Sequence, residues 1–432
     1  MDSSKPVYAN YLPDELLLEI LNYIPRDRES QSTIATFCAV SRQWYDVAIP
    51  TLYEAPYVTG HAYTLFVRTI CPSVIPRIKK SELAGLVQQL DLSAIVHQGG
   101  KSTTARLLGR MKSSLELFVA PQASFAINCW ASLSKCTRMK VLDLSLISEA
   151  ISYQNLNQTL RQLPELERLY MPRCSSHYDS DILSKMVIWP ARLHHLTLSG
   201  SVHGKFLNEM LRQPSTFPPT LHSMSMLHCP GLDYAGIKPL LENLAETLTT
   251  VELRDLPKIK QGRFNSILTW LPRLTKLTVA IDYIDQNFAH MPPTFSPARY
   301  RDAKPLQHLT LLSSGQSDSD PARAFSVGDL FDLIDMRFLG RLRYVVVAKS
   351  TGWNCANEGA ELEALRDLLV WELDRENWEM GRWHYEGLAG VKKDMQFADW
   401  ALNTAKGRGM RARLVVWDDR GAERERRWPE LR

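Results

Sequence analysis

A short run of glycine, lysine and hydroxyl residues is the segment that most resembles a chemical motif. Residues 99–104 have the sequence GGKSTT, follow an apolar stretch and precede a helical pattern, as a phosphate-binding loop does. Such a loop also needs a glycine five residues before the glycine of its Gly-Lys pair, so that the backbone can cradle phosphates. Ile95 occupies that position. The pattern therefore favours an ordinary turn with a helix start at Lys101 over a nucleotide site.

Histidine and cysteine spacing predicts neither a metal site nor a disulfide framework. His194 and His195 are adjacent, so in a strand their side chains point to opposite faces and do not easily share a metal ion. The cysteines number 7, and no two are spaced Cys-x-x-Cys, which favours free thiols in a reducing compartment. Since no nucleophile–base pair or carboxylate pair stands in a recognisable motif, we expect a protein that is not an enzyme and holds no cofactor or metal.

A repeated apolar pattern predicts the elements that would position any site. The pattern is L-x-x-L-x-L, with other apolar residues allowed, and Val87-Gln-Gln-Leu90-Asp-Leu92 is its first copy. The copies start at residues 87, 112, 139, 166, 193, 221, 248, 274, 306 and 342, and Lys112 replaces the first apolar residue of the second copy. The first seven intervals all lie within two residues of 27, inside the range of about 20–29 residues typical of leucine-rich repeats.

Each copy predicts one strand, because alternating apolar residues give a single buried face. Helical patterns such as residues 156–163 separate the copies, and prolines such as Pro164 and Pro272 stand just before the strands, where they end a helix. One strand–helix unit cannot bury its own apolar face, so the copies must stack. We therefore expect an α/β fold: a curved leucine-rich-repeat solenoid with parallel strands on its concave face. The alternative is an ordinary α/β domain with strands at similar intervals.

The copies resemble the leucine-rich-repeat family over residues 83–349. In the longer repeats of that family, Asn or Cys stands three residues after the last strand leucine. Cys174 and Cys229 fit this position, whereas the other copies have neither residue there. The resemblance therefore implies an irregular subtype.

The residues between the motif leucines should point away from the core, where a partner could contact them. We expect the substrate-binding residues on this face to include Asp91, Glu116, Asp143, Tyr170, Thr197 and Glu252. The first three are acidic, and nothing in the local pattern pairs them with Lys or Arg. On neighbouring strands about 4.8 Å apart, they should form an acidic row that suits a basic segment of a substrate. The alternative is a solvated sheet face.

Residues 12–53 predict two short helices. Pro13 suits the first turn of a helix, and Asp14 and Glu15 suit its positive end. Apolar residues then recur at helical spacing until Pro25, and a second apolar pattern runs from Ile34 to Ala48. Helices this short bury little surface alone, so they should pack on the next domain or on a partner.

This segment resembles an F-box. The matching residues are Leu12-Pro13-x-Glu15-Leu16-Leu17-x-x-Ile20-Leu21 and Val40-Ser41-Arg42-x-Trp44. The resemblance implies binding to a Skp-type adaptor and, through it, to a cullin–RING ubiquitin ligase. The adaptor-contact or supporting positions that it implies are Leu12, Pro13, Leu16, Ile20, Leu21, Val40 and Trp44. Residues 26–33 are polar where many F-boxes carry a leucine, which predicts a longer loop between the helices.

Charge and hydropathy indicate which partners and which cellular compartment to expect. The net charge of +4 comes from 51 basic and 47 acidic residues. Residues 406–432 hold the whole excess, and their interleaved acids favour a solvated tail over a nucleic-acid arm. Neither a signal-type N-terminus nor 18 consecutive apolar residues occurs in the sequence. We therefore expect a cytoplasmic or nuclear protein that contacts neither nucleic acid nor membrane.

Tryptophan is concentrated near the C-terminus, because seven of the 11 tryptophans follow residue 350. This favours a hydrophobic cap on the last repeat over a surface that stacks on nucleic acid. The predicted domain order is an N-terminal tail (1–10), an F-box (11–55), a linker helix region (56–82), leucine-rich repeats (83–349), a helical Trp-rich cap (350–405), and a last strand with a basic tail (406–432).

Both resemblances together imply a substrate-recognition subunit of a Skp–cullin–F-box ubiquitin ligase. The F-box would dock on the adaptor while the repeats hold a protein substrate. A leucine-rich-repeat interaction scaffold acting without the ligase is the alternative. An enzyme that uses the Lys101 loop is a weaker one.

Overall fold

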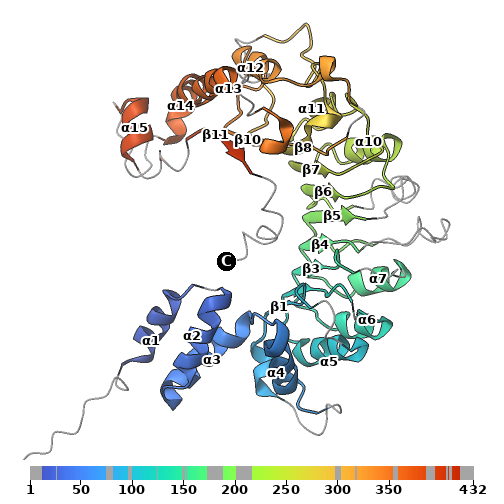
Figure 1. Cartoon of the computed structure of the whole chain (residues 1–432), viewed down its shortest axis with the longest axis vertical. Coiled ribbons are helices and arrows are strands. Elements are labelled where there is room, and N and C mark those ends of the chain that lie inside the picture. Colours follow the sequence, from blue (N-terminus) through green and yellow to red (C-terminus); the bar gives the residue numbers. More distant parts are fainter. Residues whose placement is uncertain are drawn as a thin grey trace, which may run out of the picture. The chain divides into compact units, whose positions relative to one another are not determined.

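The protein is a mixed α/β protein with parallel strands (Figure 1). A computed structural model describes residues 12–25, 27–73, 81–95, 100–123, 125–147, 151, 153–172, 188–200, 217–296, 303–316, 319–353, 359–385, 395–404, 407 and 411–418. The chain divides between Leu196 and Thr197 into two compact units. Within these ranges, no helix combines the length and apolar character needed to cross a membrane.

The first unit begins with helices and continues with short strands. Its helices are α1 (Asp14–Asn22), α2 (Arg28–Cys38), α3 (Arg42–Glu54), α4 (Gly60–Ile70), α5 (Lys101–Met111), α6 (Ile127–Leu133), α7 (Tyr153–Leu160) and the 3-10 helix η2 (Glu82–Leu86). Its strands are β1 (Gln89–Asp91), β2 (Leu117–Val119), β3 (Val141–Asp143) and β4 (Arg168–Tyr170), which pair in sequence order and in parallel. Helices α6 and α7 lie on one side of β3 and β4 (Figure 1). Because α5 begins at Lys101, the helix start expected there is confirmed.

The second unit repeats this arrangement with longer strands. After β5 (His195–Ser199), which contains the boundary, come β6 (Ser223–Leu227), β7 (Thr250–Arg254), β8 (Lys276–Ala280), β9 (His308–Leu312), β10 (Tyr344–Ala348) and β11 (Arg413–Trp417). Strands β6 to β11 pair in sequence order and in parallel. The helices are α10 (Tyr234–Asn243), α11 (Ile267–Trp270), α12 (Val327–Asp335), α13 (Gly359–Asp367), α14 (Asp374–Tyr385), α15 (Phe397–Asn403), the 3-10 helices η4 (Ile281–Tyr283), η6 (Pro321–Arg323) and η7 (Lys349–Thr351), and the π-helical η8 (Leu368–Leu373).

The motif leucines form the core of the sheet, as their alternation predicted. Leu277 pairs with Leu309, and Leu309 pairs with Val345. All three side chains are completely buried. Turns precede several of the strands: the Leu166 N–H donates to the Leu163 carbonyl at 3.3 Å, and the N–H groups of Met139, Leu193, Leu221, Leu274 and Leu342 likewise donate to the carbonyl three residues earlier. Each of these bonds turns the chain just before a strand, and the first motif residue that donates it is fully buried.

The second copy of the motif begins at Leu115, and its expected start at Lys112 is wrong. Leu90 pairs with Phe118, and Phe118 pairs with Leu142. The copy is therefore Leu115-x-x-Phe118-x-Ala120, three residues further along the chain. The physical reason is burial: Leu115 and Phe118 are fully buried, whereas Lys112 lies exposed at the end of α5.

The tryptophans near the C-terminus have mixed environments. Trp353, Trp378 and Trp400 are buried, and Trp378 and Trp400 form an apolar cluster with Phe397. Trp371 is exposed, with the Arg411 guanidinium 4.5 Å from its ring centroid. The side chain of Trp383 and the whole of Trp428 lie outside the described residues. A hydrophobic cap on the last repeat therefore stays a prediction.

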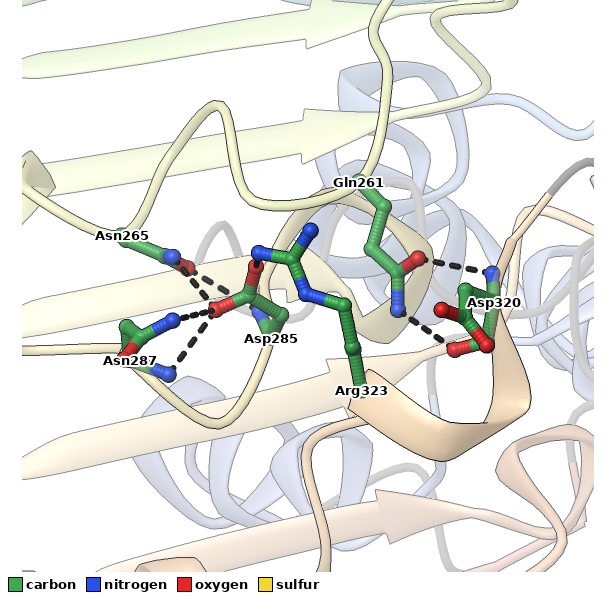
Figure 2. A network of polar contacts seen from close by, with 6 residues as sticks. All are labelled: Gln261, Asn265, Asp285, Asn287, Asp320 and Arg323. Carbon is green, nitrogen blue, oxygen red and sulfur yellow. Dashed lines mark hydrogen bonds and ion pairs between the residues drawn. The ribbon is translucent and has the colours of Figure 1, made fainter.

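A buried carboxylate joins the connections that follow β7, β8 and β9 (Figure 2). Asp285 is 2% exposed, and its Oδ1 accepts hydrogen bonds from Asn265 Nδ2 at 2.7 Å and from the Asn287 N–H at 2.8 Å. Its Oδ2 is ion-paired with Arg323 Nη2 at 2.9 Å. Beside it, Gln261 exchanges two hydrogen bonds with the Asp320 backbone. The network therefore ties together three connections between successive strands.

Asp285→Ala is expected to destabilise the protein by about 2–3 kcal/mol, because buried partners of a charged group lose their hydrogen bonds. Arg323 is 56% exposed and stays hydrated in the variant, so it adds little to that cost. Urea denaturation measures the change. Asp399→Ala, at an exposed position of α15, is the control. Equal midpoints for the two variants would contradict the role assigned to this network.

Four of the five described cysteines are buried, and Cys38 is half-buried. Cys229 stands just after β6, and its thiol donates to the Leu198 carbonyl at 3.4 Å. Burial raises the pKa of Cys129 to about 11 and the pKa of Cys136 and Cys229 to about 12. The described cysteines are free. Cys174, the other residue at the repeat position of Cys229, lies outside the described residues.

These three thiols should not react with a disulfide reagent in the native protein at about pH 8, near the ordinary thiol pKa of about 8.5. The half-buried Cys38 should react first. Because the folded-state pKa values are raised, the uncharged thiols stabilise the fold below the ordinary thiol pKa, and this stability is lost as the pH rises above it. Thiol counting before and after urea addition checks the prediction, and rapid native labelling of Cys229 would contradict it.

Candidate functional site

Helices α1, α2 and α3 pack around a small apolar core of their own. Trp44 of α3 is partly buried against this core, and its ring centroid lies 4.0 Å from that of Phe37. The core fixes the rotation of each helix and so decides which apolar side chains remain in water. Its buried residues are Leu17, Leu21, Ile34, Phe37 and Ala48.

Helix α1 carries apolar side chains outward as well as inward. Leu17 and Leu21 are buried, whereas Leu16 and Ile20 are 48% and 42% exposed. A helix turns about 100° per residue, so Leu16, Ile20 and the exposed Tyr23 fall on one side of α1, next to its buried face. Apolar side chains grouped in water make this side of α1 a candidate surface for contact with another protein.

The start of α1 and the start of α3 are joined by Gln43. Its Nε2 donates to the Leu12 carbonyl at 2.8 Å and to Asp14 Oδ1 at 2.7 Å. Ser41 caps α3 by accepting a hydrogen bond from the Trp44 N–H, and Val40 immediately precedes this cap. Pro13 at the start of α1 and the exposed Val40 therefore lie at the same end of the helical module formed by α1, α2 and α3. The two residues are 27 positions apart in the sequence.

The predicted adaptor-contact residues fall into two groups. Members of one group are open to contact, whereas members of the other hold the helices together. The exposed group is Pro13, Leu16, Ile20 and Val40. The buried or partly buried group is Leu12, Leu21 and Trp44.

Sequence reasoning missed some exposed apolar side chains of the module. Tyr23 is 79% exposed, and Leu18 of α1 and Tyr45 of α3 are more than two-fifths exposed. The signal for Tyr23 is its spacing, seven residues after Leu16 and three after Ile20, which places it on their side of the helix. Leu18 falls on the other flank of the buried face.

The connections between these helices differ from the expectation in two ways. The longer loop expected at residues 26–33 is wrong, because α2 already begins at Arg28 with Asp27 accepting from the Ser30 N–H at 2.8 Å. The single helix expected after it is two helices, α2 and α3, interrupted at residues 39–41. In both cases a polar residue caps a helix and redirects the chain.

The acidic row expected on the first strands is also wrong. Asp91 pairs with Val119, and Val119 pairs with Asp143. Val119 therefore holds the position that was assigned to Glu116. Asp143 is 2% exposed, and its Oδ1 accepts from the Ser145 N–H and hydroxyl, so it does not point outward to a partner.

Glu116 lies before its strand and is paired. Its carboxylate accepts from Lys140 Nζ at 2.8 Å and from Arg138 Nη2 at 2.6 Å. The hydrogen bond from Lys140 holds the pKa of Glu116 below its ordinary value. A carboxylate already bound to two cations offers little to a basic substrate, and the expectation that nothing pairs with it is corrected.

The other predicted strand-face residues lie in varied surroundings. The ring of Tyr170 is half-buried, with its centroid 5.1 Å from that of His195. Thr197 is buried. Glu252 is ion-paired with Arg254 at 2.6 Å and accepts from the Ser225 hydroxyl at 3.1 Å. Substrate binding by these residues stays a prediction.

Residues 9–59, which include α1, α2 and α3, match the F-box-like family. The chain is 28% identical to the F-box protein YDR306C of Saccharomyces cerevisiae over 377 residues, which cover 83% of this chain and 73% of that protein. It is 28% identical to the protein pof5 of Schizosaccharomyces pombe over 276 residues, 63% of this chain and 74% of that one.

Among solved structures, a chain of the yeast Rad7 and Elc1 complex aligns with 62% of this chain and 79% of its own length. The TM-score is 0.23 and the identity 13%, a similarity too low to bear on fold or function. The sequence matches are the informative ones. They confirm that the chain carries an F-box-like domain and is homologous to F-box proteins.

Proposed function

We propose that this protein is a substrate-recognition subunit of a Skp–cullin–F-box ubiquitin ligase. The observation that carries the proposal is the exposed apolar side of α1, with Leu16 and Ile20, inside the residues that match the F-box-like family. An apolar surface of this kind gains free energy when a partner removes it from water.

The two groups of predicted residues have separate roles in this proposal. Pro13, Leu16, Ile20 and Val40 contact the Skp-type adaptor directly. Leu12, Leu21 and Trp44 support them, because they pack against the core that orients the helices. Tyr23 extends the contact surface along the same side of α1.

The strands that follow hold the protein substrate. We take them to form a leucine-rich-repeat solenoid, with the parallel strands on its concave face and the C-terminal helices as a cap. The buried, register-matched motif leucines support this assignment. The chain performs no chemistry itself: holding a substrate close to the ligase raises the effective concentration of its lysines near a charged conjugating enzyme. Such a ligase works in the cytoplasm or nucleus, where we expect this protein.

Co-purification from cells tests the proposal. The tagged full-length chain should capture the Skp-type adaptor and a cullin together. Capture of neither would contradict the ligase role and favour a repeat scaffold that works without it.

A further inference from the structure

Strands β8 to β11 carry a row of side chains that the proposed function has not yet used. The strand registers place Lys276 beside His308, His308 beside Tyr344, and Tyr344 beside Arg413. Each of the four immediately precedes a buried core residue of its strand, so all four point to the face opposite the core. Lys276 and Arg413 are exposed, and His308 and Tyr344 are half-buried.

The two middle members of this row form a flat aromatic platform. The rings of His308 and Tyr344 are stacked, with centroids 4.5 Å apart and planes inclined by 17°. Burial, and then the charge of Lys276, lowers the pKa of His308. A lowered pKa favours the uncharged imidazole, and the row has a cation at each end with two aromatic rings between them.

No acid belongs to these strands. Their sequences are KLTVA, HLTLL, YVVVA and RLVVW, which contain neither Asp nor Glu. Two acids that flank them within the described residues, Asp282 and Asp418, have other partners. Asp282 accepts from the Ser313 and Ser314 hydroxyls, and Asp418 is ion-paired with Lys349 at 2.8 Å. On the neighbouring strand β7, Glu252 is ion-paired with Arg254. The strands themselves supply only positive charge to this face.

We propose that this row binds an extended acidic segment of the substrate, with a carboxylate at each end and an aromatic or aliphatic side chain between them. The inference rests on the proposed function, for which it names the class of substrate. Strands about 4.8 Å apart put Lys276 and Arg413 about 14 Å from each other, and an extended chain rises about 3.3 Å per residue. Carboxylates four residues apart in the substrate therefore reach both cations, and the side chain midway between them faces the His308–Tyr344 platform.

A short peptide tests this directly. The probe is a fluorescein-labelled peptide with the sequence Glu-Ser-Phe-Ser-Glu, titrated with the full-length chain and followed by fluorescence anisotropy. Combined Lys276→Glu and Arg413→Glu should weaken binding by about tenfold or more, and added salt should weaken binding to the unchanged protein. The matched control is Lys258→Glu, an exposed lysine in a turn of the same unit, which should leave the affinity unchanged.

Several outcomes would overturn the inference. These are equal binding by the double variant, equal binding of a peptide with Gln in place of both Glu residues, and binding only when phosphoserine replaces Glu. Thermal unfolding checks that the double variant is folded; if it is not, Lys276→Gln with Arg413→Gln takes its place. Adaptor capture is measured in parallel. Capture without peptide binding rejects this inference alone, and peptide binding without capture rejects the proposed ligase role alone.

Discussion

Leu16→Asp combined with Ile20→Asp is expected to abolish binding of the Skp-type adaptor while the protein stays folded. Both side chains are more than two-fifths exposed, so the free protein tolerates a charge at either position. In the complex each carboxylate would be buried without a partner. Apolar anchors at the centre of an interface contribute about 2 kcal/mol or more each, so the pair should lower the affinity by about a thousandfold or more.

A matched control is available on the same helix. Leu18 is 46% exposed and lies on the other flank of the buried face, so Leu18→Asp should leave adaptor binding intact. Pull-down with purified adaptor measures binding, and circular dichroism shows that each variant is folded. A folded double variant that still binds the adaptor as the unchanged protein does would refute the contact surface assigned to α1.

Leu115→Ala is expected to destabilise the protein by about 2–5 kcal/mol, the usual cost of emptying a buried leucine site. Leu115 is fully buried and begins the second repeat motif, with its N–H bonded to the Met111 carbonyl at 3.0 Å. Lys112, where the pattern first placed this motif, is exposed. Lys112→Ala should therefore change the stability by no more than about 0.5 kcal/mol.

Urea denaturation of the two variants compares these positions in one assay. A large loss for Lys112→Ala together with a small one for Leu115→Ala would restore the first placement and contradict the observed register. Lys112 and Leu115 are only three positions apart, so a difference in stability between the two variants reports the difference in their burial.

The strands could be predicted because the spacing of their leucines follows from which strand positions are buried. Leu277 and Leu309 alternate with polar residues, and a half-buried strand requires that alternation. The second copy failed because Leu115 and Leu117 offer two overlapping alternations, and the residue that decides between them is Phe118, which the leucine pattern did not emphasise. Choosing Leu115 and Leu117 as the strand leucines then placed Lys112, at the end of α5, in the first position of the second motif.

The helical module shows a different limit. Its apolar spacing predicted which faces are buried, yet the polar residues from Arg28 onward were assigned to a loop. They form the first turns of α2 because Asp27 caps the helix, and a helix surface accepts polar residues as readily as a loop does. The polarity of a segment therefore does not distinguish a loop from the exposed surface of a helix.

Side-chain partners were the least predictable feature of the candidate sites. Glu116 accepts a hydrogen bond from Lys140, which lies just before β3. Asp285 pairs with Arg323, which is 38 residues further along the chain. Such pairs depend on which connections the sheet brings together, and no local spacing encodes that. The expected acidic row failed partly for this reason and partly because Val119, rather than Glu116, pairs with Asp91 and Asp143. The Lys276–Arg413 row was recognised only from the strand registers.

The central claim is that the F-box-like domain of this protein binds a Skp-type adaptor. Isothermal titration of the purified full-length chain with purified adaptor tests it most directly. The proposed function predicts a saturable complex with one adaptor per chain, lost when Leu16 and Ile20 are both aspartate. Absence of binding by the folded, unmodified chain would contradict the claim.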